Sequence, residues 1–323
     1  MKAWKKALIG GASIGASIVG ALTARKIITK KLCDLAIVRA TPEQMAKEKS
    51  RVSGSKRTDE EKNAAKEAAT AFEGREHETV EITSYDGTKL VGHYFKAKKP
   101  KRVIIAMHGW RSAWNYDYAG ISEFFERNGC SVLYAEQRGQ NASGGDYMGF
   151  GVIERYDCLE WAKFLADEEC CNIPIYLYGV SMGAATVMMT SNLDLPKNVS
   201  GIIADCGYTS PKEIWQHVIE NNLHIPYAFI AGRVDKEYKK YINAECDYSC
   251  EEALSETKIP LLFIHGTDDK FVPIEMTYRN YKACASSKEL LIVPGAGHAK
   301  CYALEKERYE IRMREFFKKN DRL

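Results

Sequence analysis

The stretch that decides the fold is Ile175-Tyr176-Leu177-Tyr178-Gly179-Val180-Ser181-Met182-Gly183-Ala184-Ala185-Thr186. It opens with a short apolar run typical of a buried strand, and the residues from Ala184 onward can begin a helix. Between the two lies Gly-x-Ser-x-Gly, the pattern of a sharp turn from strand to helix. The two glycines leave room for the adjoining strand and helix. We expect the hydroxyl of Ser181 to project from the sheet edge toward the helix N-terminus.

Short apolar runs alternate with longer helical patterns on both sides of this turn, which predicts a mostly parallel sheet with helices on both faces. An Asp86-Gly87 turn joins the first two runs as an antiparallel hairpin. One interval, residues 211–258, contains no strand pattern and is rich in aromatic residues, so we interpret it as a helical insertion. The predicted strands are Thr79–Ser84, Lys89–Phe95, Arg102–His108, Ser131–Ala135, Ile175–Gly179, Gly201–Asp205, Pro260–His265 and Glu289–Val293.

A serine hydroxyl becomes a strong nucleophile only when a base takes its proton and a carboxylate orients that base. Asp269 follows the strand at residues 260–265, and His298 follows the last strand in Pro294-Gly295-Ala296-Gly297-His298. The chain order Ser, Asp, His is the one that accompanies a strand-turn-helix serine. We therefore predict that Ser181 is the nucleophile, His298 its general base and Asp269 the orienting acid.

These motifs resemble the α/β-hydrolase superfamily, and within it the serine aminopeptidase S33-like and monoglyceride-lipase-like esterases. The resemblance implies an α/β-hydrolase fold from Thr79 onward, with the insertion forming a helical lid after the sixth strand. In these relatives the strand before the acid ends in His-Gly-x-x-Asp-x-x-Val-Pro, which aligns Asp269 rather than Asp268 with the acid. Asp205 is the alternative acid, because some members of the superfamily take the acid from the end of the preceding strand.

Acyl transfer places negative charge on the carbonyl oxygen, so two backbone N–H groups should point at that oxygen. Met182, directly after the nucleophile, is expected to supply one of them. The loop His108-Gly109-Trp110-Arg111 resembles the His-Gly-x-x loop of the same relatives, so Trp110 is expected to supply the other, with Arg111 as second choice. The Trp110 side chain is also a candidate substrate-binding wall, and a packed loop aromatic is the alternative.

The N-terminal stretch Ala7–Thr23 is apolar and uncharged, and lysines and arginines flank it. Its 17 residues reach the lower limit for a membrane-spanning helix and exceed what a signal peptide needs. We predict a membrane anchor in residues 1–31, a charged helical linker in residues 32–78 and the hydrolase domain in residues 79–323. A cleaved signal is the first alternative. A buried Gly/Ala-rich helix is the second, although glycines weaken a soluble helix.

The net charge of +3 arises from 46 basic and 43 acidic residues, which gives no case for a nucleic-acid partner. The ten cysteines lack the spacing of a disulfide framework, so reduced thiols are expected. Cys246 and Cys250 have no second pair at zinc-ligand spacing, so no metal and no cofactor are expected. The slight excess of basic residues after the apolar stretch favours a cytoplasmic catalytic domain, with the extracytoplasmic face as the alternative.

The resemblance implies a serine hydrolase for a small-molecule ester or a short peptide. Aromatic lid residues suit an apolar acyl group, so ester hydrolysis is our first expectation. A peptidase of the S33 type, the second, would need a carboxylate for the substrate's ammonium. A catalytically silent binding protein is the third, although such proteins ordinarily lose a triad member. No oligomeric state follows from the sequence. The candidate carboxylates for a peptidase are Glu213, Glu220, Asp235 and Glu237.

Overall fold

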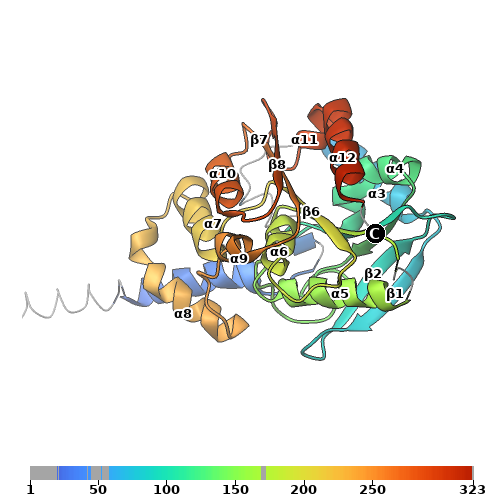
Figure 1. Ribbon diagram of the computed structural model, residues 1–323. Helices are drawn as coiled ribbons and strands as arrows, with labels where there is room; N and C mark the ends of the chain where they lie inside the picture. The colour runs from blue at the N-terminus through green and yellow to red at the C-terminus, as the bar shows by residue number, and fades with distance from the viewer. Residues whose placement is uncertain are drawn as a thin grey trace, which may run out of the picture.

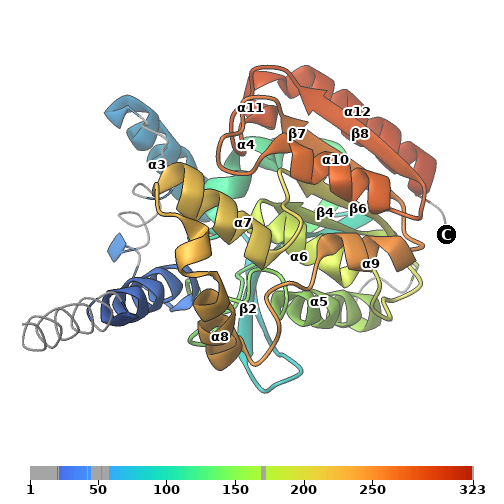
Figure 2. The same ribbon diagram turned by 90° about the vertical axis from the view of Figure 1, so that its left-hand side faces the viewer.

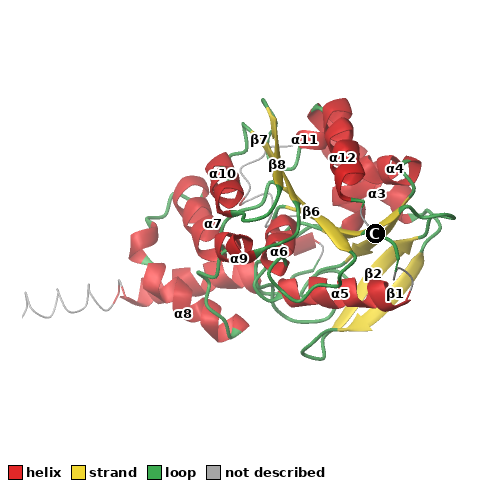
Figure 3. Cartoon of the chain, in the orientation of Figure 1, coloured by secondary structure: helices red, strands yellow, loops and turns green. Residues whose placement is uncertain are grey.

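The computed structural model of the 323-residue chain describes residues 20, 22–41, 43–44, 52, 58–168 and 172–321. Within them, eight strands form one sheet in the order β1-β2-β4-β3-β5-β6-β7-β8. The strand β2 runs antiparallel to β1 and β4, and every other neighbouring pair is parallel. Helices cover both faces of this sheet (Figures 1 and 3). The predicted α/β-hydrolase fold is confirmed.

All eight predicted strands are present, and their ends lie within two residues of the predicted ones. The strands could be predicted from their apolar runs because the central strands are buried on both faces of the sheet. The strands are β1 Glu78–Thr83, β2 Lys89–Phe95, β3 Arg102–Met107, β4 Cys130–Ala135, β5 Ile175–Val180, β6 Val199–Asp205, β7 Leu261–Gly266 and β8 Lys288–Val293.

The sheet separates two apolar cores. Because successive side chains of a strand point to opposite faces, β3 contributes Ile105 and Met107 to one core and Ile104 and Ala106 to the other. Helices α4, α11 and α12 cover one face, and α5, α6, α9 and α10 cover the other (Figure 1). The helices are α4 Trp114–Arg127, α5 Glu154–Glu168, α6 Met182–Thr190, α9 Cys250–Glu256, α10 Ile274–Ala283, α11 Cys301–Leu304 and α12 Lys306–Asn320.

The helix before the sheet, α3 (Asp59–Glu73), begins with a capping box. The Thr58 side chain accepts a hydrogen bond from Glu61 N–H, and the Glu61 carboxylate accepts one from Thr58 N–H. At its other end Phe72 is buried and packs edge-on against Trp114 of α4. This part of the segment expected to be a linker is therefore anchored on the hydrolase domain.

The segment between β6 and β7 is helical, as predicted. It contains α7 (Pro211–His217), a π-helical turn η1 (Val218–Asn222), a 3₁₀ turn η2 (Tyr227–Phe229) and α8 (Ala231–Ile242), which are together called the lid here (Figure 2). The helix α9, which the expected lid range 211–258 included, packs instead against α6 and α10. It therefore belongs to the body of the domain.

Residues 22–37 form a helix, here called the N-terminal helix, that lies beside the lid (Figure 2). Tyr241 of α8 donates a hydrogen bond to Asp34 over 2.5 Å. Cys33 and Ile37 are buried in the core that the lid shares. The expected linker began at residue 32, but residues 32–37 continue this helix and pack on the domain, because apolar side chains recur along them at helical spacing.

In the part of the chain that the structure describes, no helix has both the length and the apolar character needed to cross a membrane. Most of the predicted anchor at residues 7–23 lies outside the described residues.

Candidate active site

Ser181 occupies the turn between β5 and α6, where the Gly-x-Ser-x-Gly pattern predicts it. Its backbone has φ of 56° and ψ of −115°, a conformation that is strained for any residue with a side chain. A hydrogen bond from Ser181 N–H to the carbonyl of Asp205, over 2.8 Å, holds the backbone in this strained conformation. The side chain is thereby fixed at the start of α6 and is only 6% exposed.

The two glycines of the pattern are required by close backbone contacts. A Cβ atom on Gly179 would lie 2.1 Å from the carbonyl oxygen of Gly183, and one on Gly183 would lie 1.8 Å from the carbonyl oxygen of Met107. Real Cβ contacts are never this short, so any side chain at either position would push α6 away from the sheet.

Replacing Gly183 by alanine is expected to lower the free energy of unfolding by roughly 3–5 kcal/mol, because the new methyl group meets backbone that cannot turn aside. Urea denaturation measures this change. Gly232→Ala is the control, since nothing lies within 4 Å of a Cβ there, and alanine favours the helix. Equal stability of the two variants would contradict the close packing of the turn.

The structure brings the three residues predicted as nucleophile, base and acid into one hydrogen-bonded row. His298 Nε2 lies 2.9 Å from Ser181 Oγ, and His298 Nδ1 lies 2.7 Å from Asp269 Oδ2. The other carboxylate oxygen of Asp269 accepts from the N–H groups of Phe271 and Val272, each over 2.9 Å. A carboxylate held in this way can orient the imidazole so that Nε2 accepts the serine proton, as predicted for Asp269.

His265 also contacts Asp269, a contact that was not predicted from the sequence. His265 Nε2 lies 3.2 Å from Asp269 Oδ2 and 2.9 Å from the carbonyl of Val272, and all three groups are buried. Burial alone raises the pKa of Asp269, but the charge of His298 and hydrogen bonds from both histidines hold this pKa well below its usual range. The sequence feature that could have indicated this contact is the short spacing, since His265 stands four residues before Asp269.

Asp205, the alternative acid, is engaged elsewhere. Its Oδ2 accepts a hydrogen bond from Tyr309 over 2.9 Å, and its backbone carbonyl holds Ser181. Burial raises the pKa of Asp205 to about 6, which disfavours the permanent charge that an orienting acid needs. The structure therefore places Asp269, and not Asp205, against His298.

The predicted oxyanion loop follows β3, and its backbone donors can be assigned by their partners. Gly109 N–H donates to Asp117 Oδ2 over 2.7 Å. Arg111 N–H donates to Gln140 Oε1, also over 2.7 Å. Within the described residues, Trp110 N–H between them has no hydrogen-bond partner. Of the two predicted choices in this loop, Trp110 is thus the available donor and Arg111 is not.

The loop lies directly against the serine. A Cβ atom on Gly109 would lie 3.4 Å from Ser181 Cβ. Met182 is the first residue of α6, so its N–H has no acceptor within the helix. The N–H groups of Trp110 and Met182 are therefore the candidate donors to an oxyanion at Ser181.

The N-terminal helix ends on this same loop. Trp110 Nε1 donates to the carbonyl of Ala36 over 2.9 Å. Arg111 Nη2 donates to the carbonyls of Leu35 and Val38 over 2.7 and 2.8 Å. Because the last carbonyls of a helix lack intrahelical partners, these side chains cap the helix and at the same time fix the loop.

An almost wholly apolar cavity opens beside Ser181. The N-terminal helix borders it with Leu32, Leu35 and Ala36, and the lid borders it with Ile214, Trp215 and Ile219. The Trp110 side chain, predicted as a substrate-binding wall, also lines the cavity. An apolar cavity of this kind suits the hydrocarbon part of a substrate.

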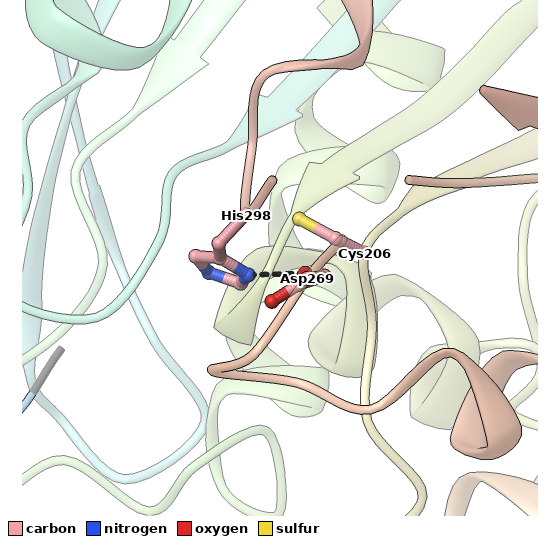
Figure 4. A group of neighbouring side chains, drawn as sticks. All are labelled: Cys206, Asp269 and His298. Carbon is pink, nitrogen blue, oxygen red and sulfur yellow. Dashed lines mark hydrogen bonds and ion pairs between the residues drawn. The ribbon is translucent and has the colours of Figure 1, made fainter. Parts of the chain in front are cut away.

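Cys206 lies beside the acid and the base (Figure 4). In the described part of the chain, its thiol and the side chains of Asp269 and His298 form the group of potential metal ligands, with ligand atoms within 4.8 Å of one another. Burial raises the pKa of Cys206 well above its usual value, which keeps the thiol protonated. Because metals bind the thiolate, and because His298 and Asp269 already bind each other, these residues fit a metal ion poorly.

Comparisons with known proteins identify the family and the fold. A sequence model of the prolyl oligopeptidase family matches residues 115–321. The Bacillus subtilis protein YqkD is 24% identical over 251 residues, which are 76% of this chain and 81% of YqkD. An esterase of Pyrococcus furiosus, Pf2001, superimposes with a TM-score of 0.63 at 23% identity and covers 76% of this chain and 92% of its own. Est1E of Butyrivibrio proteoclasticus, solved with ferulic acid bound, gives 0.56 at 18% identity over 75% and 98% of the chains.

Proposed function

Because the chain belongs to the prolyl oligopeptidase family, we propose that it is a serine hydrolase that cleaves carboxylic esters through an acyl-enzyme on Ser181. The observation that carries the proposal is the row of short contacts from Ser181 through His298 to Asp269 beside an apolar cavity. The hydroxyl, the base and the acid are already in reach of one another, which is the arrangement that nucleophilic catalysis requires.

In the proposed reaction Ser181 Oγ attacks the ester carbonyl carbon while His298 Nε2 takes its proton. The negative charge on the carbonyl oxygen is stabilised by the N–H groups of Trp110 and Met182. His298 then returns the proton to the departing alcohol, which leaves an acyl group on Ser181. A water molecule repeats the attack with His298 again as base, and the carboxylic acid departs. Asp269 stabilises the imidazolium at both steps.

The nature of the cavity supports an apolar acyl group as substrate. Its lining is almost entirely hydrocarbon, and aromatic residues such as Trp110 and Trp215 contribute to it. We therefore propose functional kinship with the monoglyceride-lipase-like esterases. The N-terminal residues 1–31 are proposed as a membrane anchor that keeps the domain in residues 79–323, with its lid, near lipid-derived esters, on the cytoplasmic side.

A serine peptidase is the second candidate, because the family carries the name of a peptidase; the S33 type comes from the sequence resemblance alone. Such an enzyme needs a carboxylate in its substrate site. Of the candidates, Glu213 forms an ion pair with Arg279 over 2.8 Å. None of Glu213, Glu220, Asp235 and Glu237 borders the cavity at Ser181 in the described part of the chain. This arrangement favours the ester.

The proposal is tested on the full chain with a fluorophosphonate probe and a substrate panel. We expect one adduct by intact mass, turnover of p-nitrophenyl esters, and a preference for butyrate or longer acyl groups over acetate. Aminoacyl p-nitroanilides form the comparison series. Faster turnover of the anilides would make the peptidase the better assignment, and the absence of both adduct and turnover on folded protein would refute the hydrolase.

A further inference from the structure

The N-terminal helix contributes apolar side chains both to the core and to the wall of the cavity. Cys33 and Ile37, four residues apart, are buried in the core, and Cys33 also lines the cavity. Leu32, Leu35 and Ala36, at i, i+3 and i+4, are only partly buried and border the cavity at Ser181. These three side chains pack against the core and also line the cavity, so the part of their apolar surface that stays uncovered is available to a substrate. The helix is thus part of the cavity wall as well as of the core.

This wall is held at a fixed place relative to the serine. Capping by Trp110 and Arg111 ties the end of the helix to the loop that lies against Ser181. Just beyond the helix, the Arg39 guanidinium donates to the carbonyl of Ser143 over 2.6 Å. Because the helix is attached at these points, its distance from Ser181 should be the same whichever substrate is bound.

The side chains of the helix that line the cavity lie at increasing distances from the oxyanion loop. Ala36 is the position whose carbonyl is bound by Trp110, so it lies at the end of the helix nearest the oxyanion loop. Leu32 stands four residues earlier, slightly more than one turn and about 6 Å further along the helix axis. A chain that starts at Ser181 and follows the wall would therefore meet Ala36 first and Leu32 later.

We propose that the N-terminal helix sets the length of the acyl chain that the enzyme accepts, with Ala36 and Leu32 as successive specificity-determining positions. The substrate class is straight-chain acyl esters, whose hydrocarbon chain lies between this helix and the lid. This inference rests on the proposed ester hydrolysis, since it concerns the same site. The small side chain of Ala36 leaves the path open, and a larger side chain there closes it.

The test compares Ala36→Phe with the wild-type chain on p-nitrophenyl acetate, butyrate, octanoate and laurate. We expect kcat/KM to fall at least about tenfold for octanoate and laurate, the scale on which a hydrophobic pocket discriminates chain length, and to change little for acetate. Lys31→Phe, on the exposed face of the same helix, is the matched control and should leave the profile unchanged.

Leu32→Phe is the second variant, and it is expected to penalise laurate while leaving octanoate less affected than Ala36→Phe does. It also provides the test if Ala36→Phe does not fold, which a melting curve reports. Uniform loss across all four esters, or a profile equal to that of Lys31→Phe, overturns the inference while wild-type turnover stands. Absence of turnover and of fluorophosphonate labelling in the wild-type chain refutes instead the hydrolase on which the inference rests.

Discussion

Replacement of Ser181 by alanine is expected to lower kcat for ester hydrolysis by roughly 10⁴- to 10⁶-fold, the range found when a triad nucleophile is removed. The reason is that the variant keeps the cavity and both candidate oxyanion donors but has no oxygen that can form the acyl-enzyme. Initial rates with p-nitrophenyl butyrate measure the loss, and intact mass after fluorophosphonate treatment should show no adduct.

The Ser181 variant should stay folded, which makes the comparison clean. Alanine has the same Cβ as serine, so the strained backbone at φ 56° carries the same cost in both chains. The hydrogen bond from residue 181 N–H to Asp205 is also unaffected. Ser200→Ala, whose hydroxyl bonds only the nearby Asn198 carbonyl in the described contacts, is the matched control and should keep full activity. Retained turnover or labelling in the Ser181 variant would contradict a nucleophilic role.

The turn around Ser181 was predictable because its requirements are local. Gly179 and Gly183 must be glycines for contacts within one strand, one turn and one helix, and all of these lie within a dozen residues of sequence. The same is true of the buried strands, whose apolar runs record their surroundings directly. Local requirements leave a local pattern, so both features could be predicted from the sequence.

The role of the N-terminal helix could not be predicted in this way. The sequence near Ala36 shows apolar residues and a charged neighbourhood, which equally suit a linker helix and a packed one. What fixes the helix is its contact with Trp110 and Arg111, more than 70 residues away, and with Tyr241 on the lid. The helical spacing of apolar residues shows that the segment can form an amphipathic helix, but it does not show where in the domain that helix docks.

The choice between Asp269 and Asp205 was of the same kind. Asp205 ends β6 and Asp269 follows β7, at the sheet edge where the serine lies, so position alone did not separate them. They differ in their partners. The Asp269 carboxylate accepts hydrogen bonds from two backbone N–H groups and contacts two histidine side chains, whereas the Asp205 carboxylate accepts a hydrogen bond from the Tyr309 hydroxyl. Tyr309 belongs to α12, near the C-terminus, so the sequence around Asp205 does not indicate this hydrogen bond.

Substituting asparagine for Asp269 is therefore expected to lower kcat by about 10⁴-fold, with little change in KM. The amide retains the shape of the carboxylate but carries no charge to stabilise the imidazolium, and its NH₂ group can force His298 into the tautomer that cannot accept the serine proton. The pKa of Asp269 is held well below its usual range, so the wild-type carboxylate is charged throughout the assay range. The asparagine carries no titratable group, so raising the pH within that range should not restore the activity of the variant.

Asp205→Asn is the matched comparison, because it makes the same change at the same sheet edge, and the asparagine oxygen can still accept from Tyr309. We expect this variant to lose less than about tenfold in kcat, since Asp205 does not orient the base. Rates from pH 6 to 9 with one ester decide between the two carboxylates. If Asp205→Asn lowered kcat more than Asp269→Asn, Asp205 at the end of β6 would be the carboxylate that stabilises the His298 imidazolium. The contact between His298 and Asp269 would then belong to the resting enzyme alone.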